Sequence, residues 1–170
     1  FEYLLTLMSH FHGMAGEDQY RIRGEDALGK MKEWAVHSEW NWKNKLLLMQ
    51  AEYYNTQRNF EQAVICYEAS IKAARESKFV HEEALGSELA ALFFLERGLR
   101  EKAWGYFEHS MGCYEKWGAF LVAKRIEDTR NEEFGSDFAV PSRTNDELSS
   151  SYDAATEEQS KETSSRKRPM

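Results

Sequence analysis

The histidines offer the most chemistry in this sequence, because an imidazole can bind a metal, move a proton or accept a phosphoryl group. The segment His81-Glu82-Glu83-Ala84-Leu85 begins like the helix of a zinc protease. In that motif a second histidine follows four residues later, on the same helix face, but this position holds Leu85. We therefore predict no metal site at this segment and none elsewhere in the sequence.

The other four histidines are interpreted as ordinary solvated residues. His10 and His12 are two residues apart, so they lie on different sides of a helix and do not form a chelating pair. His37 and His109 lie on otherwise polar helical surfaces, and no flanking residue distinguishes either of them. A phosphotransfer relay through His37 or His109 is kept as the alternative function, since a helical phosphotransfer domain uses one such side chain.

The two cysteines, Cys66 and Cys113, each precede a tyrosine in a predicted helix. We interpret both as small buried side chains rather than as a redox pair. Two cysteines are too few for the disulfide framework of a small secreted domain, so a reducing cytoplasm is the predicted location. The glycines match neither GxxxxGK[ST] nor GxGxxG, and no cofactor is predicted.

Glutamates recur along the predicted helices, and we interpret them as solvated faces rather than as paired catalytic acids. This group comprises Glu61, Glu68, Glu82, Glu83, Glu101 and Glu108. An acidic groove for a basic peptide is the functional alternative. No catalytic residue is predicted, and the chain itself is not expected to be an enzyme.

The elements expected to carry these residues are helices. Apolar residues recur at steps of three and four, and Pro141 and Pro169 are the only prolines, so the first 140 residues contain no obligatory helix breaker. The predicted helices are Tyr3–His12, Asp26–Ser38, Trp42–Thr56, Phe60–Ser77, Val80–Arg97, Arg100–Lys116 and Ala119–Glu132. Short polar breaks between them favour antiparallel neighbours.

The chain matches itself when it is shifted by 40 positions. This shift aligns Ala63 with Ala103 and Tyr67-Glu68 with Phe107-Glu108. A small residue followed by an aromatic residue four positions later is typical of tetratricopeptide hairpins, in which small residues allow close helix approach and rings fill the gaps. The fold class predicted is all-α, an α/α solenoid of tetratricopeptide-like helical hairpins.

The repeat pattern and the change in composition together divide the 170 residues into three parts. Residues 1–41 are the first helices of the array, 42–134 are the repeats with a closing helix, and 135–170 are a polar tail predicted to be disordered. Twenty-two Lys and Arg against 29 Asp and Glu give a net charge of −7, which excludes nucleic acid as a partner. No apolar run reaches the ~20 residues that span a bilayer, so no membrane contact is predicted.

An ordered series of motifs between about Phe1 and Arg130 resembles one particular family. The motifs are Trp34-Ala35, Asn41-Trp42, Lys45, Ala51-Glu52, Phe79-Val80-His81-Glu82-Glu83-Ala84-Leu85, Glu88-Leu89-Ala90, Phe93, Gly98, Ala103, Tyr106, Tyr114 and Trp117-Gly118-Ala119. Together they resemble the tetratricopeptide-like region that follows the AAA-like, STAND-type ATPase module of large signalling proteins. Those proteins also carry serine/threonine-kinase-like, GAF and hybrid histidine kinase domains.

The resemblance implies a place in signal transduction and no active site within this segment. We expect a non-catalytic scaffold that binds another protein or a neighbouring domain of its parent chain. The repeats give way to the polar tail, and no GAF or histidine kinase module follows within this sequence. A degenerate fragment without activity is therefore the remaining alternative.

Overall fold

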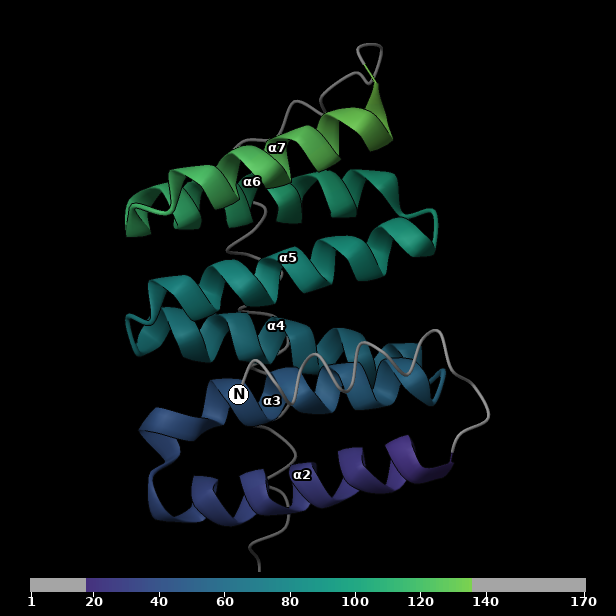
Figure 1. The fold of residues 1–170 in the computed structure, drawn as a ribbon, viewed down its shortest axis with the longest axis vertical. Coiled ribbons are helices and arrows are strands. Elements are labelled where there is room, and N and C mark those ends of the chain that lie inside the picture. Colours follow the sequence, from purple (N-terminus) through teal and green to yellow (C-terminus); the bar gives the residue numbers. More distant parts are fainter. Residues whose placement is uncertain (1–17, 136–170) are drawn as a thin grey trace, which may run out of the picture. The chain divides into compact units, whose positions relative to one another are not determined.

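Helices make up nearly all of the described part of the chain. A computed structural model describes residues 18–135, and within this range there are six helices and no strand (Figure 1). They are α2 (Asp18–His37), α3 (Glu39–Thr56), α4 (Phe60–Glu76), α5 (Val80–Glu96), α6 (Arg100–Trp117) and α7 (Phe120–Phe134). The all-α prediction is confirmed. The predicted helix Tyr3–His12 and the predicted disordered tail lie outside the described residues.

The predicted helix ends agree with the structure to within three residues, except at the start of α2. That helix begins at Asp18 instead of Asp26. The difference arises because Gly24, which weakens a helical pattern, lies inside the first turns of the helix. An internal glycine costs about 1 kcal/mol relative to alanine, and this cost does not end a helix.

The helices follow one another at a regular interval. α4, α5, α6 and α7 begin at residues 60, 80, 100 and 120, which are 20 residues apart. Each preceding turn contains a residue with positive φ, and these residues are Arg58, Lys78, Gly98 and Gly118. The next amide donates to a carbonyl five residues back, as from Asn59 to Tyr54 and from Leu99 to Phe94. This is the Schellman end of a helix, and two such units span the forty-residue shift of the sequence.

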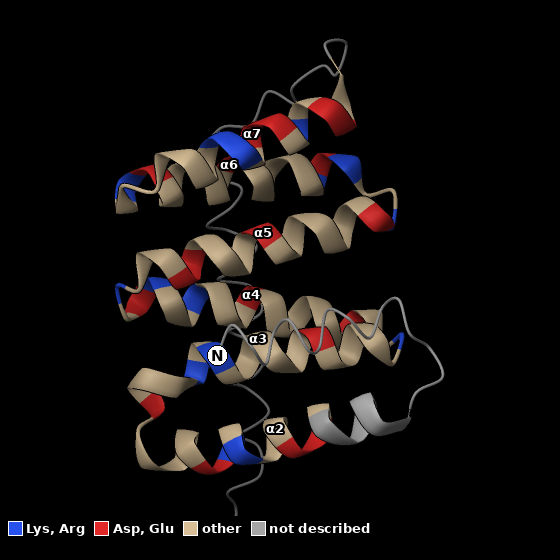
Figure 2. Ribbon diagram, viewed as in Figure 1, with Lys and Arg blue, Asp and Glu red and all other residues tan. Residues whose placement is uncertain are grey.

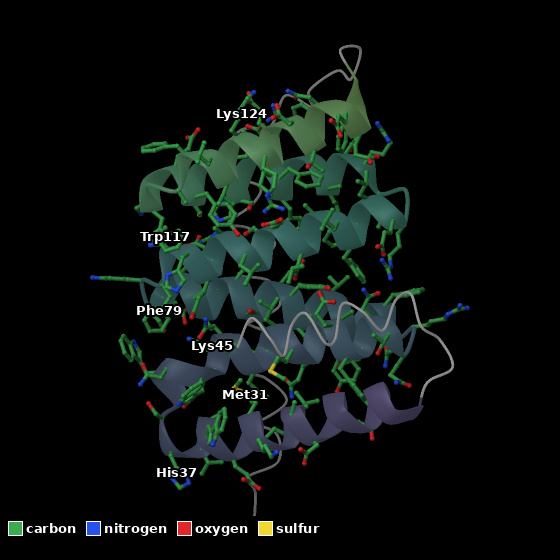
Figure 3. The ribbon with its side chains drawn as sticks, in the orientation of Figure 1. Met31, His37, Lys45, Phe79, Trp117 and Lys124 are labelled. Carbon is green, nitrogen blue, oxygen red and sulfur yellow. The ribbon has the colours of Figure 1, made fainter. Side chains whose placement is uncertain are left out.

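Consecutive helices pack against each other, most extensively α3 with α4 and α5 with α6. Ala63 and Ala103 are completely buried, and so are the rings of Tyr67 and Phe107. The predicted inward orientation of these four side chains is therefore confirmed. Met31 extends the core to the space between α2 and α3 (Figure 3).

Two serine hydrogen bonds repeat at the same forty-residue interval. The Ser70 hydroxyl donates to the backbone carbonyl of Asn44 at 2.7 Å, and the Ser110 hydroxyl donates to that of Ala84 at 2.9 Å. Both hydroxyls are buried, and each joins two helices of one pair. A small side chain with a donor thus fixes the register of α4 on α3 and of α6 on α5.

Enlarging Ala63 or Ala103 is expected to destabilise the fold. Leucine at either position has no space, because both methyl groups are completely buried at helix crossings. We expect Ala63→Leu and Ala103→Leu each to lower the free energy of unfolding by about 1–3 kcal/mol. The exposed control Glu61→Ala should change it by less than about 0.5 kcal/mol. Urea unfolding followed by circular dichroism measures both, and equal small changes would contradict the close packing.

Charged residues of both signs occur along α2, α3, α4, α6 and α7, whereas α5 carries glutamates but no Lys or Arg (Figure 2). On α7 they form a surface network, in which Lys124 lies 2.8 Å from Glu127 and 3.0 Å from Asp128. The outer side of α7 is therefore charged along its middle, although Leu121 is exposed near its start. Within residues 18–135, none of the helices has both the length and the apolar character needed to cross a membrane.

Candidate functional site

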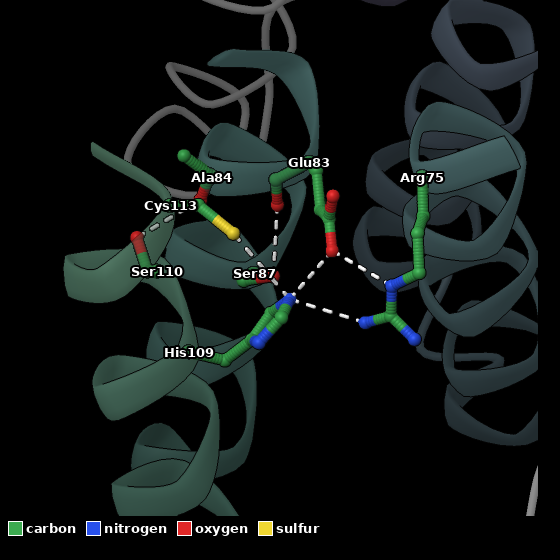
Figure 4. A network of polar contacts seen from close by, with 7 residues as sticks. All are labelled: Arg75, Glu83, Ala84, Ser87, His109, Ser110 and Cys113. Carbon is green, nitrogen blue, oxygen red and sulfur yellow. Dashed lines mark hydrogen bonds and ion pairs between the residues drawn. The ribbon is translucent and has the colours of Figure 1, made fainter. Parts of the chain in front are cut away.

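Glu83, His109 and Cys113 converge between α5 and α6 (Figure 4). Glu83 lies in the first turn of α5, while His109 and Cys113 are four residues apart on one face of α6. Glu83 Oε1 lies 2.8 Å from His109 Nε2, and Cys113 Sγ lies 3.6 Å from the same nitrogen. We call these three residues the polar cluster.

Arg75, in the last turn of α4, reaches the polar cluster from the neighbouring helix. Its Nε lies 2.8 Å from Glu83 Oε1, and one terminal nitrogen lies 3.1 Å from His109 Nε2. Half of the Arg75 side chain is exposed, whereas Glu83 is buried. The guanidinium is thus a cation at the solvent side of the cluster.

The polar cluster holds two ionised groups. Burial raises the pKa of Glu83, but hydrogen bonds from His109 and Arg75 outweigh it, so the pKa lies below its ordinary value. The contact with Cys113, followed by the hydrogen bond with Glu83, raises the pKa of His109 to about 9. At neutral pH the cluster therefore contains a carboxylate and an imidazolium.

One ring nitrogen receives more partners than it can satisfy. A carboxylate only accepts hydrogen bonds, and a guanidinium only donates them. If Nε2 of His109 carries a proton, it donates a hydrogen bond to Glu83, but it then faces an N–H group of Arg75 that is also a donor. If Nε2 carries a lone pair, it accepts a hydrogen bond from Arg75, but it then faces a carboxylate oxygen of Glu83 that is also an acceptor. In either state one of its two close contacts is unsatisfied.

The raised pKa of His109 predicts that stability depends on pH. The folded chain binds this proton more tightly than the unfolded chain, whose ordinary value is 6.5. The contribution of His109 protonation to the free energy of unfolding is therefore complete below about pH 6.5 and is lost as the pH rises to about 9. We expect the free energy of unfolding to fall by about 1–2 kcal/mol over this window, since solvent screens the one-third exposed ring.

Urea unfolding of the wild type in metal-free buffer at several pH values measures this loss. The variant His109→Gln should lack it, while His37→Gln, changed at an exposed histidine of α2, should retain the wild-type slope. Parallel profiles for the wild type and His109→Gln would contradict the protonated state of the cluster.

Aromatic side chains form a second feature at one end of the helices, where turns join α2 to α3, α4 to α5, and α6 to α7 (Figure 3). Ring centroids lie 5.3 Å apart for Trp34 and Trp42, 4.8 Å for Trp40 and Phe79, and 5.0 Å for His81 and Trp117. The term aromatic edge denotes Trp34, Trp40, Trp42, Phe79, His81, Trp117 and Phe120. Trp40, Trp117 and Phe120 are each more than half exposed.

A buried ion pair lies directly behind the aromatic edge. Lys45 Nζ lies 2.6 Å from Glu82 Oε1 and 4.9 Å from the centroid of the Phe79 ring. Asn44 also donates a hydrogen bond to Glu82. These contacts join α3 to the first turn of α5 and so support the rings between them.

Two interpretations of the sequence are wrong. Glu82 and Glu83 are buried rather than solvated, because Lys45 and Arg75 from other helices compensate their charges. Glu68 is half-buried, and burial raises its pKa. The helical spacing of the five tryptophans is typical of a buried core, and this second interpretation fails because Trp34, Trp40 and Trp117 are exposed. Trp40 and Trp42 flank Asn41 at a predicted helix start, where one of the two rings is expected to be exposed, and Trp40 is.

The candidate histidines fall into different surroundings. His37 is exposed in the last turn of α2, and His81 stacks on Trp117. His109 is not the lone surface residue that its sequence suggests. Its Nε2 is in contact with Glu83, Arg75 and Cys113, so it is less accessible than the exposed His37, which the relay hypothesis fits better. His10 and His12 lie outside the described residues.

Both cysteines are buried, as expected. Burial raises the pKa of the Cys66 thiol, which is consistent with a structural role. Cys113 differs because its sulfur contacts His109. Sequence reasoning missed this contact, although the spacing of four residues between His109 and Cys113 places both on one helix face.

No family model, curated protein or solved structure matches this chain. The function proposed below therefore rests on the geometry of the described residues and on the resemblance seen in the sequence.

Proposed function

We propose that this chain is a non-catalytic scaffold of tetratricopeptide-like hairpins that binds a protein surface through the aromatic edge. The observation that carries the proposal is the row of rings at three turns on one side of the array, between α2 and α3, α4 and α5, and α6 and α7. Large exposed aromatic groups in contact with one another are typical of protein interaction sites, and tryptophan contributes strongly to such interfaces.

The helix packing supports a rigid presentation of these rings. Repeated turns at intervals of 20 residues place the α2–α3, α4–α5 and α6–α7 connections on one side. The buried Lys45–Glu82 pair and the stacking of His81 on Trp117 limit the movement of the edge. Preorganised side chains lose less entropy on binding, which favours affinity.

The polar outer side of α7 favours the edge over the end of the stack as the contact surface. If another helix packed there, the ion pairs on α7 would lose their contact with water. The attraction within each pair does not compensate the free energy of this desolvation. The rings at the turns carry no such penalty. Binding therefore uses the side of the array on which α6 joins α7.

The family resemblance supports a partner among the ATPase or kinase-like domains of a cytoplasmic signalling protein. The partner surface must offer apolar groups to the rings, and a neighbouring domain of the same parent chain meets this requirement without a second molecule. The scaffold then acts by holding that domain in position.

The test compares two sets of variants in the complete parent protein. Trp40→Ser combined with Trp117→Ser is expected to reduce assembly and to change the ATPase or kinase output, while the chain remains folded at the assay temperature. The matched control is Leu99→Ser, which changes an exposed apolar residue at the turn between α5 and α6, on the opposite side. Unchanged assembly and unchanged output in the double variant would count against the proposal.

A further inference from the structure

We propose that Glu83, His109 and Cys113 bind a divalent cation of the zinc class through Oε1, Nε2 and Sγ. The three ligand atoms all lie within 4.8 Å of one another. Carboxylate, imidazole and thiolate are the three side-chain types that zinc uses in proteins. This site goes beyond the scaffold proposal and does not depend on it.

The two distances from His109 Nε2 are close to those required around one ion, while the carboxylate oxygen and the sulfur, which lie within 4.8 Å of each other, must approach by movement of their side chains. Tetrahedral zinc, with bonds of about 2.0–2.3 Å to these donors, separates nitrogen from sulfur by about 3.6 Å and nitrogen from oxygen by about 3.3 Å. The observed Nε2 to Sγ distance is 3.6 Å. The Nε2 to Oε1 distance is 2.8 Å and needs to open only slightly, through rotation of the Glu83 carboxylate.

A metal ion also resolves the hydrogen-bonding conflict at His109. Glu83, His109 and Cys113 then present lone pairs toward a single positive centre, so that Nε2 no longer needs a proton for one neighbour and a lone pair for another. Both Nε2 and the thiol bind the metal without their protons. Binding therefore releases these protons to solvent, and affinity rises with pH.

Arg75 supplies the positive charge when no metal is bound. Its side chain is half exposed, so the guanidinium can move into solvent when a divalent cation takes its place beside Glu83. The position that it leaves faces water. The ion would have three protein ligands and a fourth position open to water. Such a site can exchange its metal ion with solvent, unlike a structural zinc site with four protein ligands.

Rigid elements hold the three ligands. The Ser110 hydroxyl joins α6 to the carbonyl of Ala84, the residue next to Glu83, at 2.9 Å. The Ser87 hydroxyl donates to the carbonyl of Glu83 itself at 2.8 Å. Because His109 and Cys113 share one face of α6, the site requires only side-chain adjustment.

The test uses the full chain, reduced and treated with a chelator, and titrated with Zn²⁺ alone and with Co²⁺ alone. We expect one Co²⁺ per chain, with a thiolate-to-cobalt absorption band in the near ultraviolet and a rise in melting temperature on adding Zn²⁺. Cys113→Ser should lose the band. His109→Gln and Glu83→Gln should each weaken Zn²⁺ binding by at least about tenfold.

Two further variants complete the test. Cys66→Ser changes the other buried cysteine and should bind as the wild type does, whereas Arg75→Gln removes the competing cation and should bind several-fold more tightly. His109 is partly exposed, so His109→Gln should fold even if a change at Cys113 does not. A cobalt band that is absent in the wild type, kept in Cys113→Ser, or unchanged in His109→Gln would overturn the proposal.

Discussion

Replacing Phe107 with alanine is expected to lower the free energy of unfolding by about 3–5 kcal/mol. The Phe107 ring is completely buried on α6, and its centroid lies 6.3 Å from that of Phe134 on α7. Alanine removes this apolar contact area and leaves a cavity that rigid neighbouring helices fill incompletely. Urea unfolding followed by circular dichroism measures the loss.

The matched control for this substitution is Phe120→Ala. It removes the same atoms from a ring that is 68% exposed at the start of α7, and should change stability by less than about 0.5 kcal/mol. Similar losses for the two variants would contradict the assignment of Phe107 to the core and of Phe120 to the surface.

Replacing Lys45 with methionine is expected to lower the free energy of unfolding by about 2–4 kcal/mol. The side chains of Lys45 and Glu82 are only 16% and 9% exposed, so the substitution leaves a buried carboxylate without its ammonium partner. Removing one partner of a buried pair is costly because the other charge stays desolvated. Urea unfolding at neutral pH measures the effect.

Two controls separate the charge from the shape of the side chain. Lys43→Met breaks the exposed pair with Glu39, and should cost less than about 1 kcal/mol. Adding Glu82→Leu to Lys45→Met removes the orphaned charge and should recover most of the lost stability. A loss in Lys45→Met no larger than that in Lys43→Met would refute the buried pair.

The sequence was sufficient to predict the helices because the relevant signals are local. Ala63 and Tyr67 are one helical turn apart, and their spacing alone places them on one face. The turn residues recur every 20 positions, so most helix ends could also be predicted. The start of α2 was misplaced because Gly24 weakens the pattern without breaking the helix.

The candidate sites depend on contacts that sequence spacing does not reveal. Glu83 and His109 are 26 residues apart, and Arg75 and His109 are 34 residues apart. Their meeting depends on the crossing of α4, α5 and α6, which no local pattern encodes. The spacing of His109 and Cys113 was the one local signal of the polar cluster.

The aromatic edge was misinterpreted for a related reason. Helical spacing assigns Trp117 to the same stripe as Phe107 and Tyr114, but Trp117 is the last residue of α6. A stripe predicts burial only where a neighbouring helix covers it, and coverage ends at the turn. Sequence spacing alone therefore cannot separate exposed rings at helix ends from buried rings, and only the tertiary arrangement does so.

Site-specific photo-crosslinking tests the scaffold proposal most directly. A photoreactive phenylalanine analogue is placed at position 40 on the aromatic edge, or at position 99 on the opposite side, in the parent protein within its own cells. We predict that position 40 captures a defined protein segment, from another chain or from a distant part of the same one. Position 99 should not capture that segment, and Trp117→Ser should abolish the product at position 40. The absence of any product at position 40, or identical products at both positions, would contradict the account.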